Sequence, residues 1–454
     1  MYSTDVYISG HKIELVSHIN LNLKYDSIAD SFSFTAYYDP TNPVHKKIFK
    51  PLSFQTVKIV HAGVRMVTGT VLVHDFYSAG DPPKSLVQVS GYSITGILQE
   101  CTVGGFQPNY VSSTNNPDEP TKHVATQFDK CTLPQIANKI CGIFPLKVIV
   151  DPELLNDKVF MAPYAQVAIK QDEYLSDFLD NLCAQKNAIL SHDAYGNILI
   201  TRAHTGKLLT TKETRVPPYG DGITDFRYAG ATMLPNPLYY DIYYTNPVFI
   251  EAKGLLLKDT TSSDRHILHT FTGSDYMRLS TGFNGQGMHS IIQVLGQNDS
   301  TDAVVQEGSV FNPYIPLPAQ FRSQVVGGDL ANANVINIDT FGTYGVIGPL
   351  RMRRYIQSVG NDNDIKLTAR SLLNDELRRA MVITIKINGW HLSGNLVTPN
   401  QLISIKDPEV YLFNQSTFFI QEVNYSSDPA KNVATLTCVL PDAFNDNDPI
   451  KRIL

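Results

Sequence analysis

Cysteine is sparse in this 454-residue sequence, and its spacing fits neither a disulfide framework nor a structural zinc site. The cysteines are an odd number without a C-x-x-C pair, whereas both kinds of site use paired and regularly spaced cysteines. We therefore expect buried free thiols at Cys101, Cys131, Cys141, Cys183 and Cys438.

Long apolar runs are also missing. No stretch approaches 18 consecutive apolar residues, so a membrane-spanning helix is not expected. The N-terminal MYSTDVYISGHKIEL lacks the basic and apolar regions of a secretory signal. We expect a chain that is made and assembled in a reducing cytoplasm.

Charge is low as well. Charged residues make up 18% of the chain and the net charge is -6, so no basic face for sequence-specific nucleic-acid binding is expected. Aromatic residues are plentiful, with 21 Phe, 23 Tyr and one Trp. Few charges and many aromatics favour a protein that buries surface against partners.

The chain is long enough for about three domains, and its first part is a run of short strands. Apolar and polar residues alternate from residue 5 to about 105, and a hairpin is predicted to turn at His61-Ala62-Gly63. Gly, Asp and Pro turns separate the strands, which favours an antiparallel sheet closed into a barrel or sandwich. We assign residues 1–110 to this first β domain.

A linker and a small α+β module follow at residues 111–205. The linker is rich in Gly, Pro, Asn, Ser and Thr, which is typical of a surface loop. Thr132 is the expected N-cap of a helix with Pro134 in its first turn. A second helix is predicted in DEYLSDFLDNLCAQKN, with Asp172 and Glu173 in its first turn, and a hairpin is predicted at Tyr195-Gly196-Asn197.

The remaining chain returns mostly to strands. Period-two alternation in NPLYYDIYYTN predicts return strands at 206–250, and a loop-rich peripheral insertion is expected at 251–350. Residues 351–454 are expected to hold a helix from Asp364 and a second β domain made of VITIKINGW, LISIKD, TFFIQEVNY and NVATLTCVLP. The predicted fold class is therefore α+β and mainly β.

Motifs for catalysis, cofactors or metals are not found. His266 and His269 lack the i, i+4 spacing of a zinc protease helix, and Gly282 to Gly287 neither follows a clear strand nor opens a helix. The acidic pairs Asp362/Asp364 and Asp446/Asp448 lack the Gly and Glu of a calcium loop. We therefore predict no catalytic residue, no cofactor-binding residue, no metal ligand and no enzymatic activity.

Four segments, in order, resemble the baseplate hub protein of Mu-like contractile-tailed phages, a family also described as late control or gpD-like tail proteins. In VQVSGYSITGILQECT, matches to the family pattern V-x-G-R-S-x-T-x-x-L-x-D-C fall at Gly91, Ser93, Thr95, Leu98 and Cys101. Tyr92 replaces the family's Arg and Glu100 its Asp. The other segments are LPQIANKICGIF with QDEYLSDFLDNLCAQKNAILSHDAYGNILITR, the helix leading into ITIKINGWH, and LISIKDPEVYL through VLPDAF.

This resemblance implies a homotrimer in the tail baseplate of a virion. Two tube-like β-barrel domains per chain would form a pseudo-sixfold ring between the sixfold tail tube and the threefold central spike. Tape measure and DNA would pass through it on ejection, and the module, which resembles a LysM unit, would lie outside. The implied partners are tail tube, baseplate and spike proteins, with no sequence-specific nucleic acid and no membrane span.

The sequence is also compatible with two other functions. A cell-wall-binding or peptidoglycan-degrading tail protein would use the LysM-like module and a pair of carboxylates. The hub of a bacterial contractile injection system would share the fold and differ in what is ejected.

The only tryptophan, Trp390, is expected to be buried at a corner of the second β domain. Gly389 beside it would let the backbone bend there.

Overall fold

The computed structural model of the protein describes residues 3–80, 83–102, 127–142, 144, 146–170, 172–202, 267–273, 275–296, 307–315, 351–357, 362–428 and 431–444. The return strands predicted at 206–250 lie outside these residues, and so does much of the segment 251–350.

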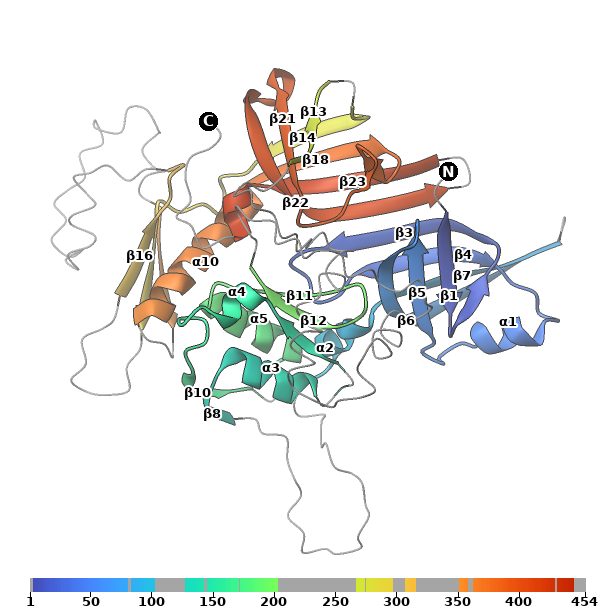
Figure 1. Ribbon diagram of the computed structural model, residues 1–454, viewed down its shortest axis with the longest axis horizontal. Coiled ribbons are helices and arrows are strands. Elements are labelled where there is room, and N and C mark those ends of the chain that lie inside the picture. Colours follow the sequence, from blue (N-terminus) through green and yellow to red (C-terminus); the bar gives the residue numbers. More distant parts are fainter. Residues whose placement is uncertain are drawn as a thin grey trace, which may run out of the picture.

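One 13-stranded sheet dominates the molecule, and all its pairings are antiparallel except β13 with β21. Seven strands form its first half: β1 (Thr4–Ile8), β2 (His11–Ile13), β3 (Val16–Lys24), β4 (Ser31–Tyr37), β5 (Thr56–His61), β6 (Val64–Gly80) and β7 (Pro83–Ser93). Six form its second half: β13 (Ile267–Phe271), β14 (Arg278–Phe283), β18 (Met381–Asn388), β21 (Leu402–Asp407), β22 (Leu412–Asp428) and β23 (Lys431–Val439). In Figure 1 the second half lies above the first.

The two halves are joined by the pairing of β22 with β3. One edge of β22 pairs first with β21, as far as Phe419, and then with β3 from Glu422 onward. The expected mainly β, α+β fold is confirmed. Two separate closed barrels are not formed by the described strands, because this shared strand merges both halves into one open sheet.

The predicted alternation of apolar and polar residues gives this sheet two different faces. Across six strands of the inner face, one row of paired residues is Val71, Gly91, Phe32, Leu21, Tyr425 and Ala434. All of them are buried except Gly91, which is half-buried. Except for Gly91, all of them belong to the single apolar core that both halves share. The alternation of buried and exposed side chains therefore continues unbroken where β22 pairs with β3.

The small module has its own apolar core. Its elements are β8 (Gln127–Cys131), α3 (Leu133–Cys141), β9 (Val148–Val150), α4 (Pro152–Leu155), β10 (Tyr164–Ala168), α5 (Leu175–Gln185), β11 (Ile189–His192) and β12 (Ile198–Thr201). Thr132 caps α3 as predicted and forms a capping box with Gln135. The second helix starts at Leu175, so Asp172 and Glu173 precede it and only Asp177 lies in its first turn.

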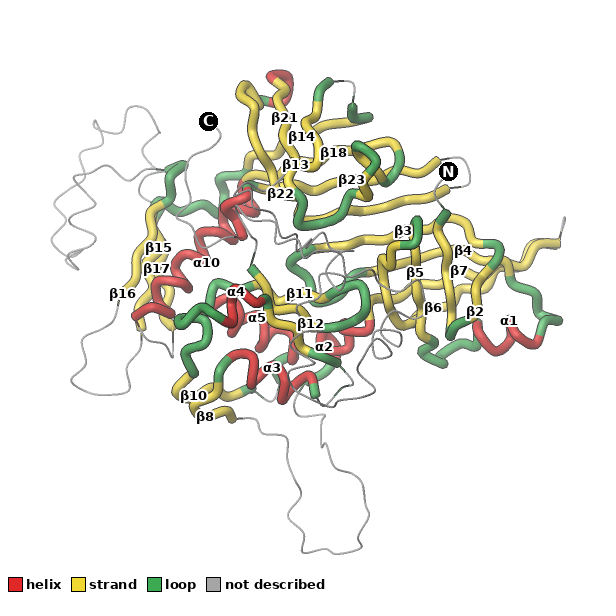
Figure 2. The backbone as a smooth tube through the Cα atoms, viewed as in Figure 1, coloured by secondary structure: helices red, strands yellow, loops and turns green. Residues whose placement is uncertain are grey.

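The remaining elements surround the sheet and the module. They are α1 (Pro43–Ile48), η1 (Ile94–Gly96), α2 (Ile97–Glu100), β15 (Ile291–Gly296), β16 (Glu307–Phe311), β17 (Met352–Gln357), α10 (Asp362–Ala380), β19 (His391–Leu392), β20 (Asn395–Leu396), η7 (Pro408–Val410) and η8 (Pro441–Phe444). Figure 2 shows most of the helix gathered in the module and α10. Residues 251–350 are predicted to be a loop-rich peripheral insertion, but β13 and β14 within this range pair with β21 and β18 of the central sheet.

All five cysteines are free, in agreement with the sequence prediction. Cys141, Cys183 and Cys438 are buried, whereas Cys101 and Cys131 are half-buried.

Trp390 is buried, as predicted, and it connects the two halves. Its ring centroid lies 5.0 Å from that of Tyr425 in β22 and 4.4 Å from that of His61 in β5. Burial lowers the pKa of His61 to about 4, so the imidazole packs against Trp390 as a neutral ring. Gly389 precedes it at φ +84, a backbone conformation that favours glycine.

The module docks on the first half through the hairpin between β11 and β12. A Cβ added to Gly196, at φ +88 in this turn, would lie 2.2 Å from the Ile94 side chain. The guanidinium of Arg65 in β6 lies 4.7 Å from the centroid of the neighbouring Tyr195 ring. At Gly196 the turn is therefore packed closely against Ile94 of η1, and at Tyr195 it contacts Arg65 of β6.

Trp390→Ala should lower the free energy of unfolding by about 3 to 5 kcal/mol, because it empties a space bounded by both halves. Urea denaturation of the full chain measures this. Phe413→Ala is the control, since this side chain is 55% exposed and its loss should change stability by less than about 0.5 kcal/mol. Equal effects of the two substitutions would contradict the assigned role of Trp390.

Gly196→Ala should destabilise the docked module more than Gly10→Ala destabilises the first half. Both glycines have positive φ, which costs an alanine about 1 to 2 kcal/mol. Only Gly196 faces a neighbour, so its alanine adds an overpacking cost of about 1 to 3 kcal/mol, whereas no atom lies within 4 Å of the Gly10 position. Thermal melting compares them, and a larger loss for Gly10→Ala would refute this packing argument.

Candidate functional site

The motifs considered in the sequence do not come together as a site. His269 in β13 contacts Ser393 and lies 3.4 Å from Asp275, while His266 lies outside the described residues. The turn from Gly282 to Gly287 presents backbone carbonyls to Arg351, which is the opposite of an anion-binding loop. Among the described residues, no group of three or more His, Cys, Asp or Glu side chains could hold a metal ion.

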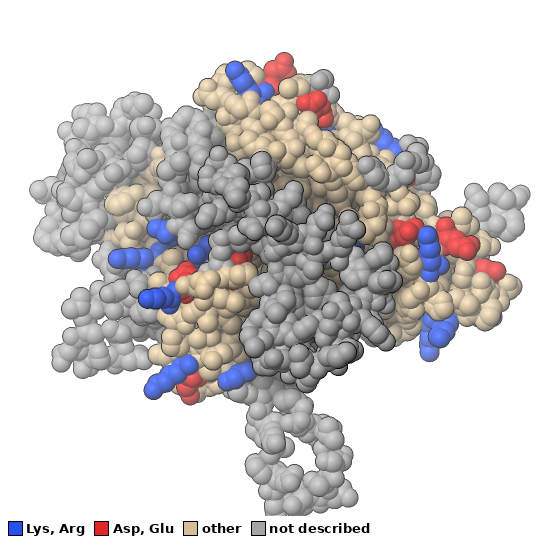
Figure 3. Space-filling view, in the orientation of Figure 1, with Lys and Arg blue, Asp and Glu red and all other residues tan. Residues whose placement is uncertain are grey.

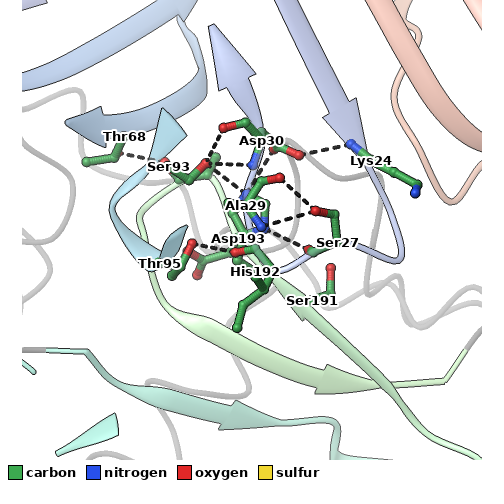
Figure 4. Close-up of polar contacts among 12 residues, drawn as sticks. Lys24, Ser27, Ala29, Asp30, Thr68, Ser93, Thr95, Ser191, His192 and Asp193 are labelled. Atoms are coloured by element: carbon green, nitrogen blue, oxygen red, sulfur yellow. Dashed lines mark hydrogen bonds and ion pairs between the residues drawn. The ribbon is translucent and has the colours of Figure 1, made fainter. Parts of the chain in front are cut away.

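The structure does assemble one buried polar cluster that the sequence does not reveal (Figure 4). Asp30 is the last residue before β4, Ser93 is the last residue of β7 and His192 is the last residue of β11. His192 Nε2 lies 3.0 Å from Asp30 Oδ2 and 2.9 Å from Ser93 Oγ. His192 Nδ1 lies 3.0 Å from the carbonyl oxygen of Ser27. We call these four residues the polar joint, because they link the module to the first half.

The polar joint is not a catalytic triad, although it contains Ser, His and Asp. In a triad the serine and the aspartate bind opposite nitrogens of the imidazole, so that one side takes the proton and the other orients the ring. Here both groups approach the same nitrogen. The side chains of His192 and Asp30 are 0% and 1% exposed, so no substrate can reach them.

Neighbouring hydrogen bonds extend the polar joint on both sides. Ser191 Oγ donates to the carbonyl of Tyr25 at 2.6 Å, and Thr95 Oγ1 donates to the carbonyl of Ile28 at 2.6 Å. Thr68 Oγ1 donates to the carbonyl of Ala194 at 2.7 Å. The joint therefore satisfies buried backbone groups of the chain between β3 and β4 and holds the module in one orientation.

The outer face of the sheet is the second candidate feature. We call it the uncharged face, and two cross-strand rows define it: Thr70, Tyr92, Ser31, Asn22, Asn424 and Thr435, then Ser90, Ser33, Asn20 and Ser426. Every one of these side chains is half-buried or exposed. Between β6 and β23 these rows hold no charged residue. Beyond Thr435 the longer row continues onto the exposed Lys386 of β18 and Arg278 of β14, and Lys24 pairs with Glu422 beside Asn22 and Asn424.

A depression of about 420 Å³ lies on the uncharged face where the halves meet. It is lined by residues of five strands, among them Asn20, Asn22, Ser33, Ser90 and Asn424. Because the lining side chains are uncharged, the surface of the depression offers hydrogen-bond donors and acceptors but no charged group. On the face drawn in Figure 3, the Lys and Arg side chains of the described residues are scattered, several of them near acidic ones. Among the described residues, no helix is long and apolar enough to cross a membrane.

Comparison with solved structures shows which proteins share this fold. The 43 kDa tail protein of prophage MuSo2 from Shewanella oneidensis is similar at a TM-score of 0.60 and 17% identity, covering 98% of this chain and 100% of that chain. The tail protein from Neisseria meningitidis MC58 is similar at 0.60 and 13% identity, covering 97% and 99%. No curated protein sequence matches the chain.

Two family models match separate parts of the sequence. Residues 120–202, which include the module, match the second domain of the gp44-like baseplate hub proteins. Residues 370–447, which include most of α10 and the last strands, match the fourth domain of the Mu phage baseplate assembly protein GpP. The resemblance drawn from the sequence is thus confirmed, and the chain carries domains of the Mu-type baseplate hub family and is a hub-like structural component of a phage tail.

Proposed function

We propose that this protein is the structural hub of a contractile-tail baseplate, and that three copies form a ring between the sixfold tail tube and the threefold central spike. Each copy would contribute its two sheet halves, so the ring would present six similar units to the tube and three identical chains to the spike. The domains proposed for this arrangement are 1–110, 111–205, 206–250, 251–350 and 351–454. The chain would assemble in the host cytoplasm and remain in the virion.

The observation that carries this proposal is the uncharged face. A channel for tape measure and DNA must let a polyanion pass, and Lys or Arg side chains on its wall would bind phosphates. The uncharged rows extend from β6 of the first half to β23 of the second because β22 pairs with β3. At Tyr92, where the family pattern has Arg, this chain places a neutral side chain on that face.

The polar joint supports the same arrangement. It fixes the module against the chain between β3 and β4. None of its four residues lines the depression, so the module does not cover the uncharged face there. A rigid module beside the ring could then contact other baseplate proteins without entering the channel.

The mass of the purified chain in solution tests the ring. Light scattering should give three times the 50.4 kDa of one chain, either alone or once the candidate spike protein is added. Images of that species viewed end-on should show a ring with a central opening. A monomer under both conditions would contradict the proposal.

A lysine scan tests the channel wall. Asn20, Ser33 and Ser90 replaced together by Lys should make the trimer retain DNA at low salt, with retention falling steeply as salt rises. The matched control places three lysines at the exposed Gln99, Gln127 and Gln166, away from the depression. Gel-shift and filter-binding assays measure retention. If both variants bind DNA equally, the uncharged face is not the channel wall.

A further inference from the structure

The polar joint contains a proton whose position is dictated by its surroundings. His192 Nδ1 faces a backbone carbonyl, which can only accept, so this nitrogen must carry hydrogen. His192 Nε2 faces the carboxyl group of Asp30 at 3.0 Å, and a hydrogen bond between them needs a proton there too. The pair therefore holds one proton more than a neutral histidine beside a carboxylate would.

Removing that proton has a cost that the burial of the pair makes large. A neutral Nε2 would turn a lone pair toward the Asp30 carboxylate, and both groups would stay out of water as long as the module is docked. If the module left the first half, Asp30 and His192 would both reach water and titrate as ordinary side chains. Docking of the module and binding of the proton are consequently linked.

We infer that the Asp30–His192 pair is a proton-dependent lock that holds the module on the first half and weakens as pH rises. A free histidine loses its proton near pH ~6.5. Docking is therefore at full strength below about that pH, and it declines above it until the docked pair itself loses the proton. This inference does not depend on the proposed hub function, because it concerns only how two parts of the chain are held together.

Other charged groups lie around the pair. From β3, Lys24 donates its backbone N–H to Asp30 Oδ1 at 2.9 Å, while its ammonium lies 3.8 Å from Asp26. From the module, the carboxylate of Asp193 accepts bonds from the backbone N–H groups of Tyr195 and Asn197.

Two further groups pack nearby. From β6, Arg65 covers the Tyr195 ring. From β22, burial raises the pKa of Tyr425 far above its usual range, with the Asp30 charge as a second cause, so this phenol is neutral throughout the range tested here.

Hydrogen exchange on the full chain tests the lock. The backbone amide of Leu175, at the start of α5, donates to the carbonyl of Cys101 at 3.0 Å and so links the module to the chain after α2. Its exchange, corrected for the intrinsic rate, is followed by mass spectrometry from pH 5.5 to 8.5. We expect corrected rates that are flat below about pH 6.5 and then rise by up to tenfold per pH unit, because one proton is released on undocking. Amides of α3, inside the module, should not follow this rise.

Asp30→Asn is the variant that removes the linkage. His192 can then be neutral, donating from Nδ1 to Ser27 while Nε2 accepts from the new amide, so the module should stay docked without a pH slope. Asp428→Asn is the matched control, because His18 and Asp428 form a 2.8 Å pair in which both side chains are more than half exposed. This control should keep the wild-type slope.

Several results would overturn the lock. They are a flat profile in the wild-type chain, a slope that persists in Asp30→Asn, or α3 amides whose exchange rises together with that of Leu175. Should Asp30→Asn fail to fold, ¹⁵N shifts of the His192 ring in the wild-type chain decide independently. Two protonated ring nitrogens at pH 6 support the lock, and a ring with one unprotonated nitrogen contradicts it.

Discussion

The strand β22 is the element on which the rest of this structure depends. Its 17 residues are long enough to pair with β21 near the start and with β3 near the end, while β23 occupies the other edge. At the changeover, β22 has a register shift between Ile420 and Glu422. Gln421 lies in this bulge and bonds through its side chain to Asp26, and its backbone carbonyl accepts from Tyr25. A bulge that bends and twists one strand lets it serve two neighbours in turn.

Sharing that strand decides what both faces of the sheet can do. Side chains of neighbouring strands stay in register where β22 pairs with β3. The apolar row continues through Leu21 and Tyr425, and the polar row through Asn22 and Asn424. The inner row closes one core over both halves, with Trp390 packed between His61 and Tyr425. The outer row gives one uncharged surface rather than two separate ones. The shared core and the polar outer rows thus follow from the same alternation.

The module is attached in a different manner. Its apolar core includes Ile28 and Leu98 from outside the module, and the contact also has close packing at Gly196, buried hydrogen bonds and one His–Asp pair. Buried polar contacts add little net stability compared with apolar ones of the same shape, yet they penalise every misaligned arrangement. The buried polar contacts fix the orientation of the module, while the apolar contacts of Ile28 and Leu98 add to its attachment.

The sequence by itself determined the local elements and much of their polarity. Period-two alternation, the Ala62-Gly63 and Gly196 turns, the Thr132 cap and the helix predicted from Asp364 each depend on residues a few positions apart, and all of them are found. It also indicated the baseplate hub family and the burial of Trp390. Only the tertiary structure decided that the halves share β22, and that Asp30, Ser93 and His192 meet although 99 residues separate the last two. Alternation tells which face of a strand is buried but not which strand lies beside it. That choice depends on how distant surfaces fit together, which no short stretch of sequence contains.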